Sequence, residues 1–127
     1  VEMYFDAIEK SEYVCFVNED TRLPMMFMDD AIRATIQLMD APLKSLNYHS
    51  NYNLSSMSFS ANELADEISS HVDFNCIYKP DYRQDIANTW PISIDDKDAR
   101  SDWNWEPKFD ITKMTEEMIT NLRRLNE

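Results

Sequence analysis

The chain has 127 residues and a formal net charge of −12, from 12 basic and 24 acidic side chains. This length predicts a single domain with a modest core, and the charge argues against nucleic acid or an anionic membrane as a partner. Because no run approaches the roughly 20 apolar residues of a membrane-spanning helix, and no basic, apolar leader is present, we expect neither a membrane span nor a targeting segment.

The first part of the chain predicts two helices with extended segments between them. Residues 1–10 predict a helix whose apolar face consists of Val1, Tyr4, Phe5 and Ile8, and residues 13–17 predict a short strand. Residues 23–28 are apolar on both faces, so we expect a buried extended segment, which Pro24 restricts to a sheet edge or to the start of a strand.

A second helix is predicted up to Ala41. Asp29 or Asp30 can cap its start, and Pro42 follows its end. The side chains expected to point inward are Ile32, Thr35, Ile36 and Met39.

The middle of the chain predicts two strands on either side of a capped helix. Residues 52–54 and 74–78 are the predicted strands. Ser60 and Glu63 form a capping box, because the Ser60 hydroxyl can accept the Glu63 amide while the Glu63 carboxylate reaches back to the Ser60 amide. The helix that follows has its apolar stripe at four-residue intervals, on Leu64, Ile68 and Val72.

Two cysteines, Cys15 and Cys76, lie in apolar surroundings within predicted strands. Their number and separation predict buried free thiols instead of a disulfide framework, which fits a reducing compartment.

Residues 81–107 form a crowded tract of aromatic, proline and charged residues with no period of 2 or 3.6. Within this tract, residues 95–102 predict a short helix, and Trp103 and Trp105 are expected in the core. A final helix over residues 110–125 would point Ile111, Met114, Met118, Leu122 and Leu125 inward.

The same tract carries a resemblance to a known family. Its Arg83, Trp90-Pro91, Asp95-Asp96, Ala99-Arg100 and the run from Trp103 to Pro107 resemble the carboxyl-terminal part of extended short-chain dehydrogenases, relatives of the sugar-nucleotide epimerases. Residues 19–35 and 52–59 narrow the resemblance to short-chain L-threonine 3-dehydrogenases, and it covers about residues 1–125.

The resemblance implies a mixed α/β (α+β) fold, with residues 1–127 forming a single substrate-binding lobe. The parent enzyme would oxidise L-threonine with NAD to 2-amino-3-oxobutanoate. Its expected partners are an N-terminal Rossmann portion and, in the full enzyme, a second subunit. We expect it in the cytoplasm of a bacterium, or alternatively in the mitochondrion of a eukaryote.

Two features that this family needs for its chemistry are absent from the sequence. The chain has no glycine, whereas a Rossmann site needs Gly-x-Gly-x-x-Gly for its tight turn and for the close approach of the pyrophosphate. None of the six tyrosines is followed four residues later by the lysine of the family's Tyr-x-x-x-Lys pair. We therefore expect the chain alone to bind no NAD and to be inactive.

The family's Trp-Gly-Trp is also changed, to Trp103-Asn104-Trp105. Asparagine tolerates a left-handed backbone better than most residues, so the turn remains feasible.

The resemblance gives three candidate substrate-binding residues, Trp90, Arg83 and Arg22. Trp90 would form an apolar wall of a pocket between the lobes. In the epimerase relatives, arginines in the regions of Arg83 and Arg22 hold a diphosphate. The position of the second of these arginines falls on Leu23 in this sequence, so Arg22 is displaced from it by one residue. That shift favours a smaller substrate with a carboxylate. The alternative for both arginines is a surface ion pair.

No metal site is predicted. His49 and His71 have no ligand partners at suitable spacing, and we expect both at the surface. The acidic pairs at 29–30, 95–96 and 116–117 lie at predicted helix starts, where the helix dipole explains them.

Two other functions stay open. The parent could be a nucleotide-sugar epimerase or reductase of the same superfamily, which a diphosphate bound near Arg83 would favour. The chain could also be a free-standing interaction module, which a stable fold without an apolar interlobe face would favour.

Overall fold

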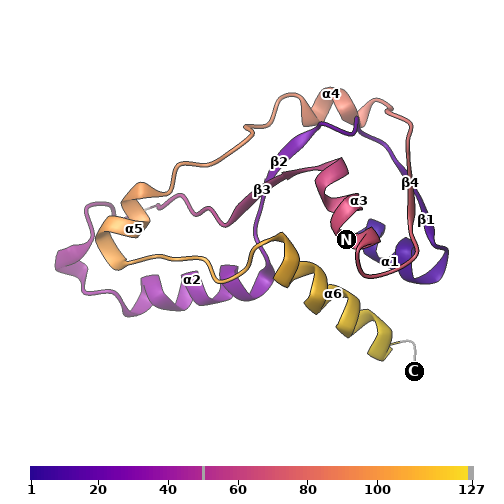
Figure 1. Ribbon diagram of the computed structural model, residues 1–127. Coiled ribbons are helices and arrows are strands. Elements are labelled where there is room, and N and C mark those ends of the chain that lie inside the picture. Colours follow the sequence, from indigo (N-terminus) through magenta and orange to yellow (C-terminus); the bar gives the residue numbers. More distant parts are fainter. Residues whose placement is uncertain (50, 126–127) are drawn as a thin grey trace.

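The computed structural model describes residues 1–49 and 51–125 of the chain (Figure 1). In these residues helices and short strands are mixed, as predicted. The elements are α1 (Glu2–Glu9), β1 (Glu12–Cys15), β2 (Arg22–Met25), α2 (Met28–Asp40), the 3-10 turn η1 (Leu43–Ser45), β3 (Met57–Ser60), α3 (Ala61–Ser69), β4 (Asn75–Tyr78), α4 (Arg83–Ala87), α5 (Lys97–Trp103) and α6 (Ile111–Leu125).

The strands form two separate two-stranded sheets. β1 pairs with β4 in parallel, with Glu12 opposite Asn75, and β2 pairs with β3 in antiparallel, with Arg22 opposite Ser60. Both strands of such a pair are edges, so the expectation that Pro24 would lie at a sheet edge is confirmed. β3 was not predicted, because its four residues are too short to show a clear alternation.

The main core lies where α1, α3 and α6 pack around β1 and β4, on the right of Figure 1. It contains Met3 and Tyr4 of α1, Ile68 of α3 and Leu122 of α6. The Tyr4 hydroxyl lies 2.8 Å from Thr115 Oγ1, so the buried polar groups of α1 and α6 satisfy each other. This region buries large apolar side chains from α1, β1, α3 and α6, whereas the apolar side chains of β4 are only partly buried.

A second, smaller core lies at the left of Figure 1, between α2 and α5. We call its buried residues, Ala34, Ala99, Trp103 and Trp105, the tryptophan cluster. The ring centroids of Trp103 and Trp105 are 5.8 Å apart, and the turn between them places Asn104 at φ 58° and ψ 40°. The core positions of both tryptophans and the left-handed turn at Asn104 are thus confirmed.

Asp30 joins α2 to the segment that leads into α6. Its side chain is 1% exposed, forms an ion pair with Arg33 at 2.6 Å, and accepts the backbone amides of Lys108 and Phe109 at 3.0 to 3.1 Å. Burial by itself raises the Asp30 pKa, but the ion pair and the two amides outweigh it and hold the pKa below its ordinary value. Asp30 is therefore a buried structural carboxylate in the first turn of α2, and the helix has no side-chain cap.

The inward stripe predicted for α2 is wrong. Ile32 and Ile36 are each 53% exposed and Met39 is 78% exposed, whereas the opposite face, with Asp30 and Ala34, is buried. The buried face is selected by the hydrogen bonds of Asp30 and by the close approach of Ala34 to the tryptophan cluster. Periodicity identified this helix but not the side that faces the protein.

Three smaller predictions also differ from the structure. Val1 and Leu125 are 79% and 78% exposed, because both lie at helix ends beyond the main core. Residues 52–54 are not a strand, since no strand in the described part of the chain pairs with them. Part of the irregular tract is helical in α4, whose five residues are too few for a periodic signal.

The buried extended segment predicted for residues 23–28 is wrong in part, because Met25 and Met28 are 41% and 65% exposed and Met28 already begins α2. The predicted capping box is confirmed. The Ser60 hydroxyl accepts the Glu63 amide at 3.1 Å while Glu63 accepts the Ser60 amide at 3.0 Å. Cys15 and Cys76 are both free, the first buried and the second half-buried. Within residues 1–49 and 51–125, no helix is long and apolar enough to cross a membrane.

Candidate functional site

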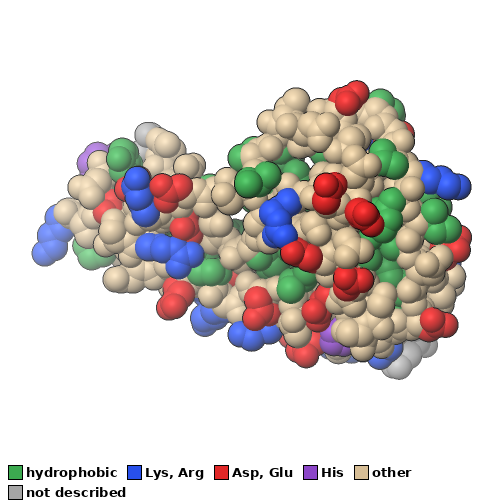
Figure 2. Space-filling model, turned by 45° about the horizontal axis from the view of Figure 1, so that its top comes forward, with side chains coloured by type: hydrophobic (Ala, Val, Ile, Leu, Met, Phe, Trp, Pro, Cys, Tyr) green, Lys and Arg blue, Asp and Glu red, His purple; other side chains and the backbone are tan. Residues whose placement is uncertain are grey.

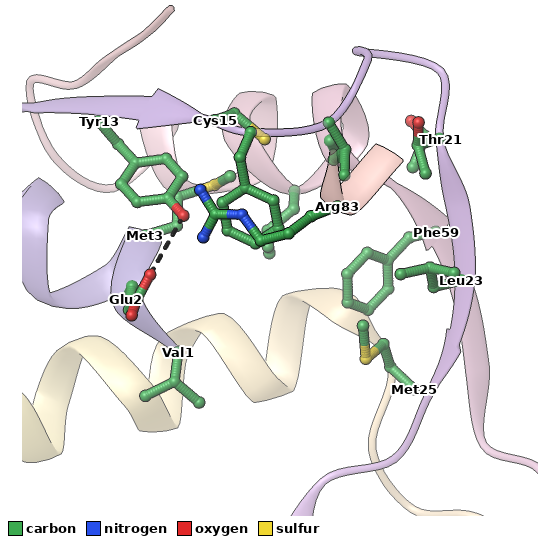
Figure 3. A pocket seen from close by; sticks show the side chains of 15 residues that line it. Val1, Glu2, Met3, Tyr13, Cys15, Thr21, Leu23, Met25, Phe59 and Arg83 are labelled. Carbon is green, nitrogen blue, oxygen red and sulfur yellow. Dashed lines mark hydrogen bonds between the residues drawn. The ribbon is translucent and has the colours of Figure 1, made fainter. Parts of the chain in front are cut away.

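A pocket of about 400 Å³ opens between the start of α1, the inner side of β1 and the β2–β3 pair (Figure 3). Its wall is mainly apolar, with Cys15, Leu23 and Phe59 among the lining residues. In the space-filling view of Figure 2 the chain has a broad part and a narrower arm, and hydrophobic side chains lie among acidic ones on the broad part. A largely apolar pocket with few polar groups is the usual form of a small-molecule site.

The alternation of β1 places one face of the strand in this pocket. Tyr13 and Cys15, on the buried face of β1, both line it, and Phe16 and Val17 just after the strand line it as well. The Tyr13 hydroxyl donates to Glu2 at 3.5 Å, as the dashed line in Figure 3 shows. Burial raises the Tyr13 pKa to about 12, so this phenol stays protonated at neutral pH. The sequence had suggested β1 but not that its inner face lines a pocket.

Arg83 is the only one of the three predicted site residues that lines the pocket. It begins α4, which Gln84 fastens to the loop after β1 by accepting the Asn18 amide at 2.7 Å and the Thr21 hydroxyl at 3.1 Å. The Arg83 guanidinium lies 3.5 Å from the centroid of the Phe16 ring, so its planar face covers an apolar wall.

Asp81 neutralises this guanidinium. Arg83 Nε and Nη2 donate to the two Asp81 oxygens at 3.0 and 2.7 Å, a bidentate ion pair. Hydrogen bonds from Arg83 lower the Asp81 pKa, and the hydrogen bond to Asp81 raises the Arg83 pKa. The short Asp-x-Arg spacing was a sequence signal for this pairing. An anionic ligand would have to compete with Asp81 for the guanidinium.

Arg22 lies at the end of the β2–β3 pair and does not line the pocket. Its guanidinium forms an ion pair with Glu63 and donates to the Ser58 carbonyl at 2.6 Å. Because Glu63 also closes the capping box of α3, Arg22 ties the sheet to the start of that helix. The surface ion pair, the alternative for this residue, is what the structure shows.

Trp90 follows α4 and is 57% exposed. Its amide donates to the Ala87 carbonyl at 3.1 Å, which fixes the turn that carries it. Ile86 and Ile92, close in sequence, are 53% and 66% exposed. Trp90 is not among the residues that line the pocket, so the structure does not bring the three predicted site residues together.

The prediction that all three acidic pairs lie at helix starts is wrong for Glu116 and Glu117, which lie inside α6. The pair at 95–96 has local partners. Asp95 forms an ion pair with Lys97 at 3.4 Å, and Asp96 forms one with Arg100 at 2.8 Å. In the part of the chain that the structure describes, no group of three or more histidine, cysteine or acidic side chains is placed to hold a metal ion.

Comparison with known proteins supplies the context of this site. No family model matches the chain. It is 41% identical over 121 residues to a Bos taurus protein named "L-threonine 3-dehydrogenase, mitochondrial". The aligned region covers 94% of the chain and 32% of the relative. A solved metagenomic structure described as a monomeric L-threonine 3-dehydrogenase superposes with a TM-score of 0.95 at 83% identity, over the whole chain and 41% of that protein. The predicted resemblance to L-threonine 3-dehydrogenases is confirmed.

The similarity also extends to proteins with other names. The chain is 43% identical over 121 residues to an uncharacterised epimerase/dehydratase of Staphylococcus haemolyticus. The aligned region covers 94% of the chain and 38% of the relative. The chain thus spans about a third of the length of the curated relatives it matches, and its similarity to threonine dehydrogenases is a similarity to part of each enzyme.

The residues present do not fit the NAD site of a threonine dehydrogenase. At the junction of β3 and α3, where a strand runs directly into a helix, Ser60 fills the turn with a side chain that accepts the Glu63 amide. A pyrophosphate needs glycine at such a turn, and the chain contains none.

Proposed function

We propose that this chain is the C-terminal substrate-binding portion of an NAD-dependent L-threonine 3-dehydrogenase, which converts L-threonine and NAD to 2-amino-3-oxobutanoate and NADH. The observation that carries the proposal is the 83% identity, at a TM-score of 0.95, to a protein described as an L-threonine 3-dehydrogenase. The NAD-binding loop and the Tyr-Lys pair would lie in the part of the longer protein outside this chain, so the chain alone would form no NADH.

The chain's own part in this function is to shape and close a substrate pocket. Its apolar wall, with Leu23 and Phe59, would exclude water from the reacting hydroxyl. Arg83, which lines the pocket beside Phe16, would orient the substrate carboxylate once that carboxylate displaces Asp81. Trp90 is exposed and would cover the substrate from the α4 side.

The pairing of both candidate arginines supports a small substrate. A diphosphate carries two or more negative charges and needs free guanidinium groups. Asp81 already holds Arg83, and Arg22 would first have to leave Glu63. A carboxylate needs only Arg83 to be freed, whereas a diphosphate held by both arginines needs Arg22 as well, and Arg22 does not line the pocket. This difference favours threonine over a nucleotide sugar. The epimerase alternative keeps the support of the staphylococcal relative's name.

Two properties of the parent remain proposals. The compartment follows the source organism, cytoplasmic for a bacterium and mitochondrial for a eukaryote. The second subunit is expected from the family resemblance, although the solved relative at 83% identity is described as monomeric.

The test is a threonine and NAD assay on the longest natural protein that contains this chain. We expect threonine-dependent NADH formation, and we expect Trp90→Ala to lower kcat/KM by about tenfold or more, because it would remove the indole that we propose covers the substrate from the α4 side. Tyr48→Ala, at a half-exposed aromatic residue that contacts Tyr52 and does not line the pocket, is the matched control and should leave kcat/KM unchanged. Turnover of a nucleotide sugar without threonine oxidation would overturn the proposal in favour of the epimerase.

A further inference from the structure

One face of α2 carries large apolar side chains that nothing in the described chain covers. Met28 is 65% exposed, Ile32 and Ile36 are each 53% exposed, and Met39 is 78% exposed. At 3.6 residues per turn these positions fall within an arc of about 80°. Leu43, in the 3-10 turn that follows the helix, is also 71% exposed. We call these five residues the α2 stripe.

The α2 stripe is unusual because the helix is already held on its other side. Ala34 and Asp30 are fully buried against the tryptophan cluster and the segment before α6. The helix therefore cannot rotate to bury the stripe without breaking the Asp30 hydrogen bonds. Scattered apolar residues are normal on protein surfaces, but a continuous row along three turns of a helix indicates an interaction surface.

We propose that the α2 stripe is the docking surface for the N-terminal portion of the longer protein. The proposal rests on the proposed function, since it requires that portion to exist. About two-thirds of the curated threonine dehydrogenase relative lies outside the matched region, which is enough chain for a second lobe. The partner surface must be apolar and must accept a helix, with side chains at intervals of three and four residues.

A second copy of the chain fits the stripe less well. The net charge of −12 makes two copies repel each other. The solved relative at 83% identity is described as monomeric, so a subunit interface is not needed to keep a closely similar sequence folded. A partner within the same polypeptide needs no association between two acidic copies and is compatible with a monomer. It also makes this chain a lobe with an apolar interlobe face, unlike a free-standing interaction module.

Native methionines give a test that needs no mutation. The longest natural protein containing this chain is exposed to dilute hydrogen peroxide, and sulfoxide formation is followed at each methionine by peptide mass spectrometry. Met28 and Met39 belong to the stripe, whereas Met3 and Met114 are 7% and 8% exposed and serve as buried references. We expect the stripe methionines to oxidise within about threefold of the buried pair. Oxidation ten or more times faster than the buried pair would overturn the proposal.

Thiol labelling supplies a second measurement with a matched control. Met39→Cys and Leu125→Cys place thiols at two helical positions that are each 78% exposed in this chain. In the longer protein, we expect maleimide to react about tenfold more slowly at position 39 than at position 125. Equal rates would contradict docking. Protection that disappears on dilution, together with a dimer in light scattering, would assign the stripe to a second copy and overturn the proposal.

Neither measurement uses threonine or NAD. A protected stripe in a protein without dehydrogenase activity would leave the docking proposal standing and reject the proposed function. An exposed stripe in an active dehydrogenase would reject the docking proposal and leave the proposed function standing.

Discussion

The main core buries large side chains from each of its helices, including Tyr4, Ile68 and Leu122, whereas α2 buries Asp30 and Ala34 and leaves Ile32 and Ile36 more than half exposed. The helices of the main core therefore bury their large apolar side chains against one another. The tryptophan cluster depends instead on two indole rings, a buried carboxylate and small residues that allow close approach.

The two regions also differ in whether their buried polar side chains have hydrogen-bond partners. Tyr4 and Thr115 satisfy each other in the main core. The buried side-chain atoms without a hydrogen-bond partner in the described residues are Asp96 Oδ2 and Trp103 Nε1, at the two ends of α5 beside the tryptophan cluster. Among the described residues, the unpaired buried polar atoms thus lie in the smaller region and not in the main core.

The largest effect should come from removing the centre of the tryptophan cluster. Trp105 is 2% exposed and its indole donates to the Ser55 carbonyl at 3.1 Å, so Trp105→Ala should lower the free energy of unfolding by about 3–5 kcal/mol. Trp90→Ala, which truncates a 57% exposed indole, is the matched control and should change it by less than about 1 kcal/mol. Urea denaturation measures the free energy of unfolding of both variants. A loss in Trp105→Ala as small as that in Trp90→Ala would show that the cluster contributes little.

A smaller effect is expected from the Asp30 carboxylate, and it should depend on pH. Asp30→Asn weakens an ion pair and two charge-assisted hydrogen bonds, so we expect a loss of about 2 kcal/mol at pH 7. Because the folded-state pKa is lowered, the ionised carboxylate stabilises the fold above the unfolded pKa of about 3.9, and this contribution is lost as the pH falls through the folded pKa.

The measurement is the free energy of unfolding of both proteins as a function of pH. The difference between wild type and Asp30→Asn should shrink below about pH 4. The exposed neighbour Asp29 is the control, and Asp29→Asn should have little effect at any pH. A constant difference across this pH range would rule out the carboxylate charge as the cause.

The smallest effect concerns the turn between the two tryptophans. Asn104 has a left-handed backbone, which a Cβ disfavours, so Asn104→Ala should cost about 1 kcal/mol in the free energy of unfolding. Asn104→Gly should be neutral or slightly stabilising, because glycine adopts this conformation freely. Equal losses in both variants, compared by thermal unfolding, would show that the Asn104 side chain matters more than its backbone.

The sequence predicted features that depend on near neighbours. The capping box at Ser60 and Glu63, the turn at Asn104 and most helices were identified because their hydrogen bonds and periods span only a few residues. The family resemblance also came from the sequence, since the tract around Trp103 and Trp105 is distinctive without any knowledge of the fold.

The candidate site was predicted less well. The residue types at Arg83 and Arg22 gave no indication that Asp81 and Glu63 hold them, except for the short Asp-x-Arg spacing. Residues that line the pocket, such as Leu23 and Phe59, come from two strands that pair in antiparallel, and one of those strands was too short to predict.

The sequence by itself determined most of the helices, the start of α3, the turn that ends α5 and which family the chain resembles, because these depend on local hydrogen bonding and on residue identity. Only the tertiary structure decided which side of α2 is buried. An amphipathic pattern states that a helix has an apolar side, but the packing partner chooses the side. Here Asp30, bound by Lys108 and Phe109 from 78 and 79 residues away in sequence, turned that side outward.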